Sequence, residues 1–529
     1  MNSDLYFRVK ALRSLRALTS VSIVALMALL PAAASAETLK EALTAAYLFN
    51  PTLKGARSQL RATDNGVARA KSGYRPTITG TLQDGFEDTR TRVRSNFPPG
   101  ASIPVNGIPG VAALPLSSLS GGGSNGTFNP RSASVALQQN IFDGFRTYNS
   151  VKGAEAQVEA GREDLRTSEQ NVLLNATTAY MNVVRDQSIV NLRQNNVKVL
   201  SEQLRAAEDR FKVGEITRTD VAQARATLAG AQADLSIAQG TLYSSRAAFA
   251  QFIGHPPGTL KDPGPATKLL PRTLEDAIAV GEAENPGILG AIFRERAQEH
   301  VVKQTKGQLL PSVTLNASYT KGAQTSSPSI EQLDDARITG NVNIPIYEAG
   351  SVSAQIREAI ETLSQRRQQI DEQRESTRAN VTSAWGLLIA ARGNVASGQV
   401  QVEATGIALQ GVREEERVGQ RTVLDTLNSE QQNLNAQVNL VSFRRDLVVA
   451  SYSVLSAMGR LTAYDIALQA ELYDPTRNYG EVKDAWYGWG ASVESEQDPH
   501  VAPVRDSGRT PGQKSTDGPA YTQKLPPIP

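Results

Sequence analysis

Residues 183–220 read VVRDQSIVNLRQNNVKVLSEQLRAAEDRFKVGEITRTD, and the architecture follows from this stretch. Its first part repeats an apolar side chain every seven residues: Val183, Val190, Val197, Leu204 and Phe211. The step breaks at Gly214 and then resumes: Val221, Leu228, Leu235, Leu242 and Phe249. An apolar period of seven is typical of helices that wind into coiled coils. We therefore predict a helical hairpin with its tip at Gly214–Asp220.

The first arm of this hairpin is unusually long. No proline interrupts the chain between Arg146 and Val213. At 1.5 Å per residue a helix of that length would extend roughly 100 Å. A compact globule of this size does not accommodate such a rod, so an elongated molecule is expected.

The hairpin occurs twice. Gly214 has its counterpart at Gly419 and Asp220 at Asp425, each 205 residues further on. Upstream the offset is 235 residues, so the first copy holds 30 extra residues between Pro76 and Ile141. An internal repeat of this kind predicts two halves of one architecture. The predicted repeats are 37–270, with its hairpin at 145–254, and 271–474, with its hairpin at 350–459.

The composition excludes several kinds of active site. Cysteine is absent, which excludes disulfides, thiolate metal sites and cysteine nucleophiles. The three histidines, His255, His300 and His500, lie far apart in the sequence. There is no glycine-rich phosphate loop, nucleophile elbow or histidine–carboxylate set. We expect no catalytic residues, no metal and no cofactor, and therefore not an enzyme.

The N-terminus carries a targeting signal. Four basic residues precede the apolar run 17–30, and Ala34-Ser35-Ala36 supplies a small-residue cleavage site. This pattern predicts a cleaved signal peptide over 1–36. The alternative is a membrane anchor, although the run is short for a ~30 Å hydrocarbon core. Without residues 1–36 the chain has 51 Lys and Arg and 52 Asp and Glu. This near-neutral balance does not indicate binding to nucleic acid.

After Pro76 and Pro311 the apolar period changes to two. The predicted strand pairs are 77–88 with 131–142 and 312–320 with 336–347. Strands of about ten residues with one apolar and one small polar face are typical of membrane barrels. The alternative is an amphipathic hairpin that covers a soluble core. Placed between helices in a secreted, cysteine-free chain, the strands favour the barrel.

Two segments lack periodicity. Residues 97–130 are dense in proline, glycine and serine, which predicts a long surface loop. The counterpart in the second repeat, 322–335, is shorter. From Pro475 to Pro529 the composition predicts a disordered C-terminal tail.

Four strands per chain cannot close a barrel alone. Unpaired strand edges are not tolerated in hydrocarbon, and about eight strands form the smallest membrane barrels. Several chains must therefore share one barrel. Three copies would supply twelve strands, but the residues alone do not separate three copies from two.

Several motifs resemble one known family. They are Asn50-Pro51, Leu310-Pro311, the strand-to-helix corners 141–144 and 345–350, and the second turn 419–425 with Leu427-Asn428. Over about 37–472 the chain resembles the TolC family of outer-membrane efflux and type I secretion ducts. The resemblance implies an α+β membrane protein: a homotrimeric channel in outer-membrane lipid, with a shared 12-stranded β-barrel, four strands per protomer, and a long periplasmic α-helical coiled-coil barrel.

The resemblance also implies a function and partners. The chain would be the passive exit duct of a tripartite efflux or type I secretion system, opened at its periplasmic tip by an adaptor protein and an inner-membrane transporter of ABC or RND type. Whether the cargo is a small molecule or a polypeptide stays open. The alternatives are a periplasmic adaptor and a structural coiled-coil envelope protein without a pore.

At the hairpin tips two interpretations compete. Thr219 and Asp220 are good helix-capping residue types, and capping alone would explain them. The resemblance implies instead that Arg421 links to Thr219 and Asp220, that Asp425 forms a cation-selective ring, and that the turns at Gly214 and Gly419 dock the adaptor. Two positions depart from the family pattern, because Asn428 replaces a second ring carboxylate and Glu416 replaces an aromatic lock residue.

Overall fold

The computed structural model describes residues 36–90, 102–103, 114–115, 125–323 and 332–488. The described residues up to Asp484 belong to one compact unit, and those from Ala485 to 488 belong to a second. The fold described below is that of the first unit. The predicted signal peptide and most of the loop 97–130 lie outside the described residues.

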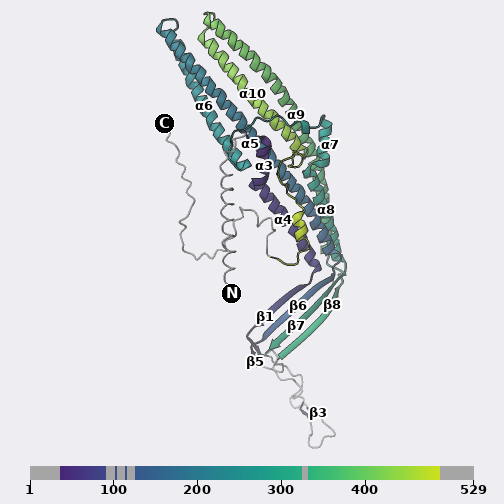
Figure 1. Cartoon of the computed structure of the whole chain (residues 1–529). Coiled ribbons are helices and arrows are strands. Elements are labelled where there is room, and N and C mark those ends of the chain that lie inside the picture. Colours follow the sequence, from purple (N-terminus) through teal and green to yellow (C-terminus); the bar gives the residue numbers. More distant parts are fainter. Residues whose placement is uncertain (1–35, 91–101, 104–113, 116–124, 324–331, 489–529) are drawn as a thin grey trace, which may run out of the picture. The chain divides into compact units, whose positions relative to one another are not determined.

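The helices of the first unit repeat in pairs (Figure 1). Helices of 11, 21, 67 and 36 residues in the first half are matched by helices of 11, 21, 67 and 35 residues in the second. The first set is α3 Leu39–Phe49, α4 Pro51–Lys71, α5 Arg146–Lys212 and α6 Arg218–Ile253. The second set is α7 Leu274–Glu284, α8 Pro286–Lys306, α9 Ser351–Arg417 and α10 Val423–Ala457. The predicted internal two-fold repeat is therefore confirmed. Short 3₁₀ turns are η1 Ser72–Tyr74, η3 Thr267–Leu269 and η4 Gly307–Leu309.

The Asn-Pro motifs fasten the short helices to the hairpins. Asn50 ends α3 and begins α4, where its side-chain oxygen accepts from the backbone N–H of Thr52 at 2.9 Å. Its Nδ2 donates to the carbonyl of Phe252 at the end of α6, at 2.8 Å. Asn285 repeats this with the carbonyl of Ala457 in α10, at 3.0 Å. One side chain therefore satisfies terminal backbone groups of two helices.

Each long helix changes its packing partners along its length. Near the hairpin tip α5 packs against α6, and α9 packs against α10. Nearer the sheet α5 packs against α4 and α8, and α9 packs against α8. The lateral order of helices next to the sheet is therefore α4-α5-α8-α9. In the tip half α10 contacts α5, so the two hairpins lie side by side (Figure 1).

The four main strands form one antiparallel sheet in the order β1-β6-β7-β8. They are β1 Thr77–Asp84, β6 Arg131–Phe142, β7 Ser312–Ala323 and β8 Gln332–Asn343. The two repeats join at β6 and β7, with Val135 opposite Tyr319. Short strands pair as β2 Glu87–Arg90 with β5 Asn125–Phe128, and β3 Ser102–Ile103 with β4 Leu114–Pro115. Apolar side chains of the edge strands are exposed in the single chain, including Leu82 (87%) and Ile338 (78%).

Strand β8 ends four residues earlier than predicted. The sequence placed the strand over 336–347, whereas it runs over 332–343. Pro345 cannot donate a ladder hydrogen bond, and Ile346 and Tyr347 are highly exposed, at 96% and 84%. The apolar run Ile344–Tyr347 therefore belongs to the corner that leads into α9.

The two halves meet closely where the helices join the sheet. Gly144 has φ +68°, and a Cβ atom there would lie 2.2 Å from the carbonyl oxygen of Gly307. A side chain at either position would separate the backbones of the two repeats. Glycine at 144 therefore permits both the turn and the contact.

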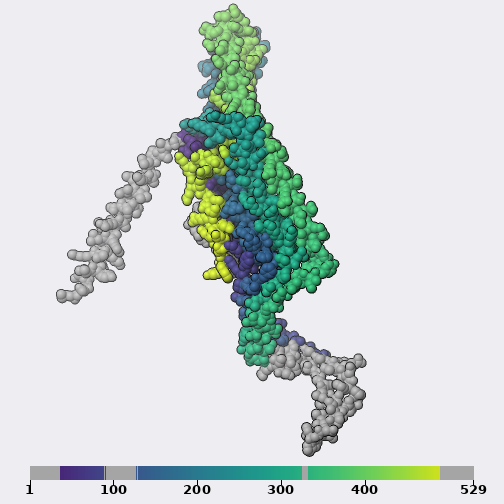
Figure 2. Space-filling model, turned by 90° about the vertical axis from the view of Figure 1, so that its right-hand side faces the viewer, coloured from purple at the N-terminus to yellow at the C-terminus, as the bar shows by residue number. Residues whose placement is uncertain are grey.

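The disordered tail was predicted to begin at Pro475, but the structure is ordered beyond that point. Residues Arg477–Val482 form helix α11, which packs on α4. Asn478 donates to Oδ2 of Asp64 at 2.7 Å, and both residues are buried. Lys71 pairs with Asp484 at 2.6 Å. These tertiary contacts order a segment whose composition predicted disorder (Figure 2, yellow). The remainder of the predicted tail, 489–529, lies outside the described residues.

None of the described helices is both long enough and apolar enough to cross a membrane.

Candidate functional site at the hairpin tips

Both hairpin tips begin their second helix with the same capping box. At the first tip the backbone N–H and the hydroxyl of Thr217 donate to Oδ2 of Asp220, at 2.9 and 2.8 Å. At the second tip Thr422 and Asp425 repeat these contacts at 3.1 and 2.9 Å. The donors lower the pKa of both aspartates, Asp220 mainly through the Thr217 hydroxyl and Asp425 mainly through the Thr422 amide. Both carboxylates are therefore held ionised next to a helix N-terminus.

Thr219 is not the capping residue. It lies inside the first turn of α6 and is exposed, while Thr217 occupies the N-cap position. Sequence reasoning missed Thr217, although Thr-x-x-Asp occurs in both turns and is a recognisable capping-box spacing. The glycines that precede the boxes, Gly214 and Gly419, have φ of +82° and +78°. This left-handed conformation favours glycine and reverses the chain after α5 and α9.

Arg421 is exposed and pairs inside its own hairpin. Its Nε lies 2.9 Å from Oε2 of Glu415, and this carboxylate raises the pKa of the guanidinium. The structure of a single chain therefore does not bring Arg421 together with Thr219 and Asp220. Asn428 is also exposed, one turn beyond Asp425.

Glu416 connects the two hairpins. Its Oε1 lies 3.2 Å from Nη1 of Arg210 on α5, and its Oε2 accepts from the hydroxyl of Thr426 on α10 at 2.6 Å. In the sequence, Glu416 departs from the family pattern because it stands where an aromatic lock residue is common. In this chain it is instead the acceptor of a cross-hairpin ion pair.

A second polar link lies further from the tip. Glu430 on α10 is buried, with 5% of its side chain exposed, and Arg413 on α9 donates to its Oε1 at 2.7 Å. Gln203 on α5 donates to the same oxygen. Oε2 of Glu430 has no hydrogen-bond partner among the described residues. Neither Arg210 nor Glu430 was singled out from the sequence, because each reads as an ordinary charge on a helix surface.

An apolar cluster lies in the same part of the hairpins. It contains buried Leu200, Ala231 and Leu427, with Val197, Leu228 and Val423 packed against it. These residues come from α5, α6 and α10, so both hairpins contribute. The tip half is thus held by a small apolar core, and polar links at its edges fix how the two hairpins meet.

Comparison with known proteins agrees with this architecture. The family model described as "Outer membrane efflux protein" matches residues 42–255 and 280–460. The outer membrane efflux protein BepC of Brucella suis is 39% identical over 456 residues, which cover 86% of this chain and 92% of BepC. The outer membrane protein TolC of Escherichia coli is 24% identical over 462 residues, covering 84% of this chain and 86% of TolC.

Solved structures with the same fold are outer-membrane channels. The Campylobacter jejuni CmeC channel aligns with a TM-score of 0.66 at 16% identity, covering 84% of this chain and 89% of CmeC. The open-state MtrE channel of Neisseria gonorrhoeae aligns with a TM-score of 0.63 at 17% identity, covering 80% and 89%. The predicted fold class is confirmed. The chain belongs to the outer membrane efflux protein family, whose members are channel proteins of the outer membrane.

Proposed function

We propose that three copies of this chain form the exit duct of a tripartite efflux system and that the hairpin tips are its periplasmic gate. The observation that carries the proposal is a shared lateral order. The strands follow β1-β6-β7-β8, and the helices that join them follow α4-α5-α8-α9. Among the described residues β1 and β8 each have one unpaired edge, and α4 and α9 are the first and last helices of their layer, so a neighbouring copy would extend both layers together.

The uncovered edges favour closure into a ring. Strands β1 and β8 present unpaired backbone groups along their outer edges, which hydrocarbon does not tolerate. If β8 of one copy pairs with β1 of the next, three copies supply twelve strands. The same rotation would place α9 of one copy against α4 and α6 of the next, which would close the helical layer around the same axis.

The tip residues would then control the opening. In this arrangement Asp425 occurs once per subunit around the axis, and within each chain its bonds to Thr422 lower its pKa, which favours the ionised form. A ring of like charges favours cations in the pore. Arg421, Thr219 and Asn428 are exposed at the tip and Asp220 is half-buried beside them, so all four would contact the next subunit in the closed state. The turns at Gly214 and Gly419 would be the docking points for a periplasmic adaptor that works with an inner-membrane transporter.

The links within one chain would resist opening. Arg210–Glu416 and the Glu430 cluster join the two hairpins, so separating the hairpins requires breaking both. A docking partner opens a two-state element only through a higher affinity for the open state. The contacts that favour the open state would be made by the adaptor at the tip turns.

We propose small molecules rather than polypeptides as the cargo. BepC, which is named as an efflux protein, shares 39% identity with this chain. Two relatives named for protease secretion, AprF of Pseudomonas aeruginosa and PrtF of Dickeya chrysanthemi, share 23% and 22% over less than two thirds of the chain.

A deletion strain tests the cargo and a purified sample tests the assembly. Loss of the protein should increase sensitivity to dyes and detergents and leave the secreted proteins unchanged. The opposite pattern would assign the duct to type I secretion. Because the chain has no cysteine, single cysteines introduced in β1 and β8 form disulfides only between copies. A cross-linked ladder that ends at three subunits would support the trimer, and one that ends at two would exclude it.

A further inference from the structure

Helices α4 and α8 are counterparts in the two repeats, but one face of α8 is covered within the chain whereas the same face of α4 is exposed. On α8 this face packs against α5. A Cβ atom at Gly290 would lie 3.5 Å from Cβ of Glu163, and one at Gly153 would lie 3.5 Å from Cβ of His300. Because α8 follows α4 at an offset of 235 residues, the same face of α4 can be identified. It carries the exposed residues Gly55, Gln59, Ala62, Asn65 and Arg69.

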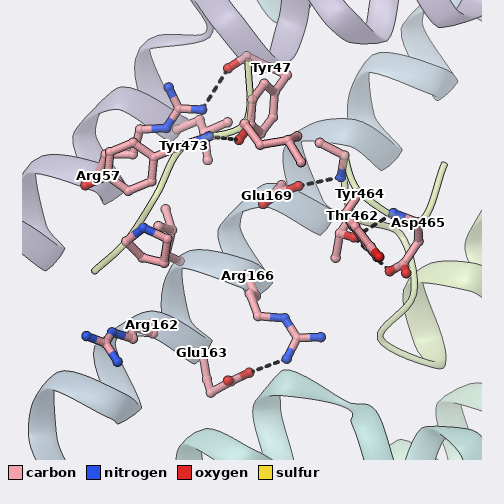
Figure 3. A pocket seen from close by; sticks show the side chains of 15 residues that line it. Tyr47, Arg57, Arg162, Glu163, Arg166, Glu169, Thr462, Tyr464, Asp465 and Tyr473 are labelled. Carbon is pink, nitrogen blue, oxygen red and sulfur yellow. Dashed lines mark hydrogen bonds and ion pairs between the residues drawn. The ribbon is translucent and has the colours of Figure 1, made fainter. Parts of the chain in front are cut away.

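Other sides of α4 are covered by its own chain. Leu60 and Val67 are buried. Arg57 lies between Tyr47 and Tyr473, with its guanidinium carbon 4.7 and 5.0 Å from the two ring centroids (Figure 3). The exposed face is therefore the part of α4 that a neighbouring copy can reach.

Helix α9 is the counterpart of α5 and has an exposed face of its own. On α5 the face that meets α8 includes Asn149, Gly153 and Glu163, and Oδ1 of Asn149 lies 3.3 Å from Nδ1 of His300. The matching positions on α9, at the offset of 205 residues, are the exposed Ala354, Glu358 and Gln368. The contact between α5 and α8 is therefore a template for a contact between α9 of one copy and α4 of the next. A head-to-tail contact of this kind closes into a ring when its rotation permits.

Near the sheet the contact between copies cannot reproduce this template closely. Gly144 and Gly307 approach each other so closely that a Cβ atom on either would lie 2.2 Å or 2.3 Å from the carbonyl oxygen of the other. Their counterparts are Ala349 and Ser72, and both carry a Cβ atom. The two backbones must therefore lie further apart between copies than between repeats. Long side chains, rather than direct contact of the backbones, would bridge this part of the interface.

Two charges of opposite sign occur at this end of the exposed faces. Glu358 on α9 and Arg69 on α4 are both exposed, and neither side chain forms an ion pair or hydrogen bond with the residues that the structure describes. In the template, Gly153 and His300 occupy the positions of Glu358 and Asn65. Asn65 of the next copy would therefore face Glu358. Arg69 lies four positions beyond Asn65 on the same face of α4, one turn nearer the sheet, where its long side chain can reach Glu358.

We propose that Glu358 of one copy forms an ion pair with Arg69 of the next copy, and that this pair joins the helical layers of neighbouring copies near the sheet. The planar guanidinium of arginine suits the two oxygens of a carboxylate. The template holds its helices differently, through an ion pair of Arg294 with Asp164. The counterparts of these two residues in the interface between copies are uncharged: Gln59 and Gln369. The inference rests on the proposed ring of three copies and identifies side chains that hold the copies together.

Charge reversal tests the pair in the full-length protein purified in detergent. The readout is the temperature at which the trimer dissociates into monomers on a gel run in SDS without boiling. Glu358→Arg and Arg69→Glu each place like charges across the interface, so we expect each to lower this temperature by about 5 °C. The double variant restores opposite charges in exchanged positions and should recover most of the loss. Recovery of this kind is the sign of a direct pair, because a general loss of stability would add up instead.

Glu202→Arg makes the same change of charge on α5, whose neighbours α4, α6, α8 and α10 belong to its own chain. It should leave the dissociation temperature unchanged, and circular dichroism checks that every variant is folded. If neither reversal changes the temperature, or if the losses in the double variant simply add, the pair is overturned while the wild-type trimer leaves the proposed ring standing. If the wild type forms no trimer, the ring is overturned and the pair with it.

Discussion

Nη1 of Arg210 lies 3.2 Å from Oε1 of Glu416, and this ion pair joins the two hairpins of one chain. The residues are 206 positions apart in the sequence and come from the ends of α5 and α9. The Glu416 side chain is 18% exposed and that of Arg210 37%. The ion pair that joins the hairpins near the tip therefore differs from the Arg421 contacts that the family resemblance implies.

Replacing Arg210 with Gln should loosen the gate. One partly exposed pair contributes only about 0–1 kcal/mol, so three copies together would bias the closed tip by up to about 3 kcal/mol. We expect Arg210→Gln to raise single-channel conductance in planar bilayers at least twofold. The same measurement on Arg421→Ser should give a smaller increase, because Arg421 pairs within its own hairpin.

A matched control removes an ion pair that does not cross between the hairpins. Arg225 pairs with Glu208 at 3.0 Å, and both belong to the first hairpin. Arg225→Gln should leave conductance unchanged. If Arg421→Ser opens the channel more than Arg210→Gln, the lock lies between subunits at Arg421.

Removing Arg413 should destabilise the tip half strongly. Glu430 is buried, and the loss of Arg413 leaves its charge with Gln203 as the remaining hydrogen-bond partner. Breaking one partner of a buried pair typically costs about 3–5 kcal/mol, and the half-exposed Arg413 places the expected cost below that range. Hydrogen exchange of α9 and α10 near the tip should accelerate in Arg413→Ala. Adding Glu430→Leu should restore protection, and failure of this rescue would show that Arg413 acts through something other than Glu430.

Asp425 should act both as a helix cap and as a pore charge, and two variants separate these roles. Asp425→Asn removes the charge, whereas Thr422→Ala removes the cap and keeps the charge. Block of the current by divalent cations should weaken in Asp425→Asn and persist in Thr422→Ala. Because the capping box lowers the pKa of Asp425 in the folded chain, the cap stays intact until the pH falls below the usual aspartate range. Equal block in wild type and Asp425→Asn would place the cation site elsewhere.

The sequence predicted the fold well because its periodicities report which faces are buried. The seven-residue step from Val183 to Leu204 marks the packing seam of α5, whereas Phe211 at its end is exposed. Period two after Pro311 marks β7. Both are local patterns. The family and the outer-membrane location, which the comparisons confirm, were implied instead by the resemblance of short motifs such as Asn50-Pro51 and the turn 419–425. The Asn-Pro pairs could be recognised as helix boundaries, although their role in tying α3 and α7 to the hairpins requires the structure.

The candidate site was predicted less completely because its contacts are long-range. Which face of α5 meets α9 depends on how two hairpins lie side by side, so nothing near Arg210 in the sequence points to Glu416. Helix α11 was missed for a similar reason. A six-residue helix has little intrinsic stability, and it is ordered by Asp64 and other groups some 400 residues away.

Docking of α11 should depend on pH through Asp64. This carboxyl is fully buried, accepts one hydrogen bond from Asn478, and has an unpartnered Oδ1 among the described residues. Burial raises its pKa above the ordinary value of 3.8. The docked state therefore retains a proton that the detached state loses, so docking is strongest in acid and weakens as the pH rises through the raised pKa.

Hydrogen exchange of Arg477–Val482 should accelerate over that interval in the wild type. Asp64→Asn should abolish the pH dependence, and Asn478→Ala should accelerate exchange by the equivalent of about 1–3 kcal/mol, the usual cost of an unsatisfied buried polar group. A pH profile in Asp64→Asn identical to that of the wild type would assign the titration to another group, such as the exposed Lys71–Asp484 pair.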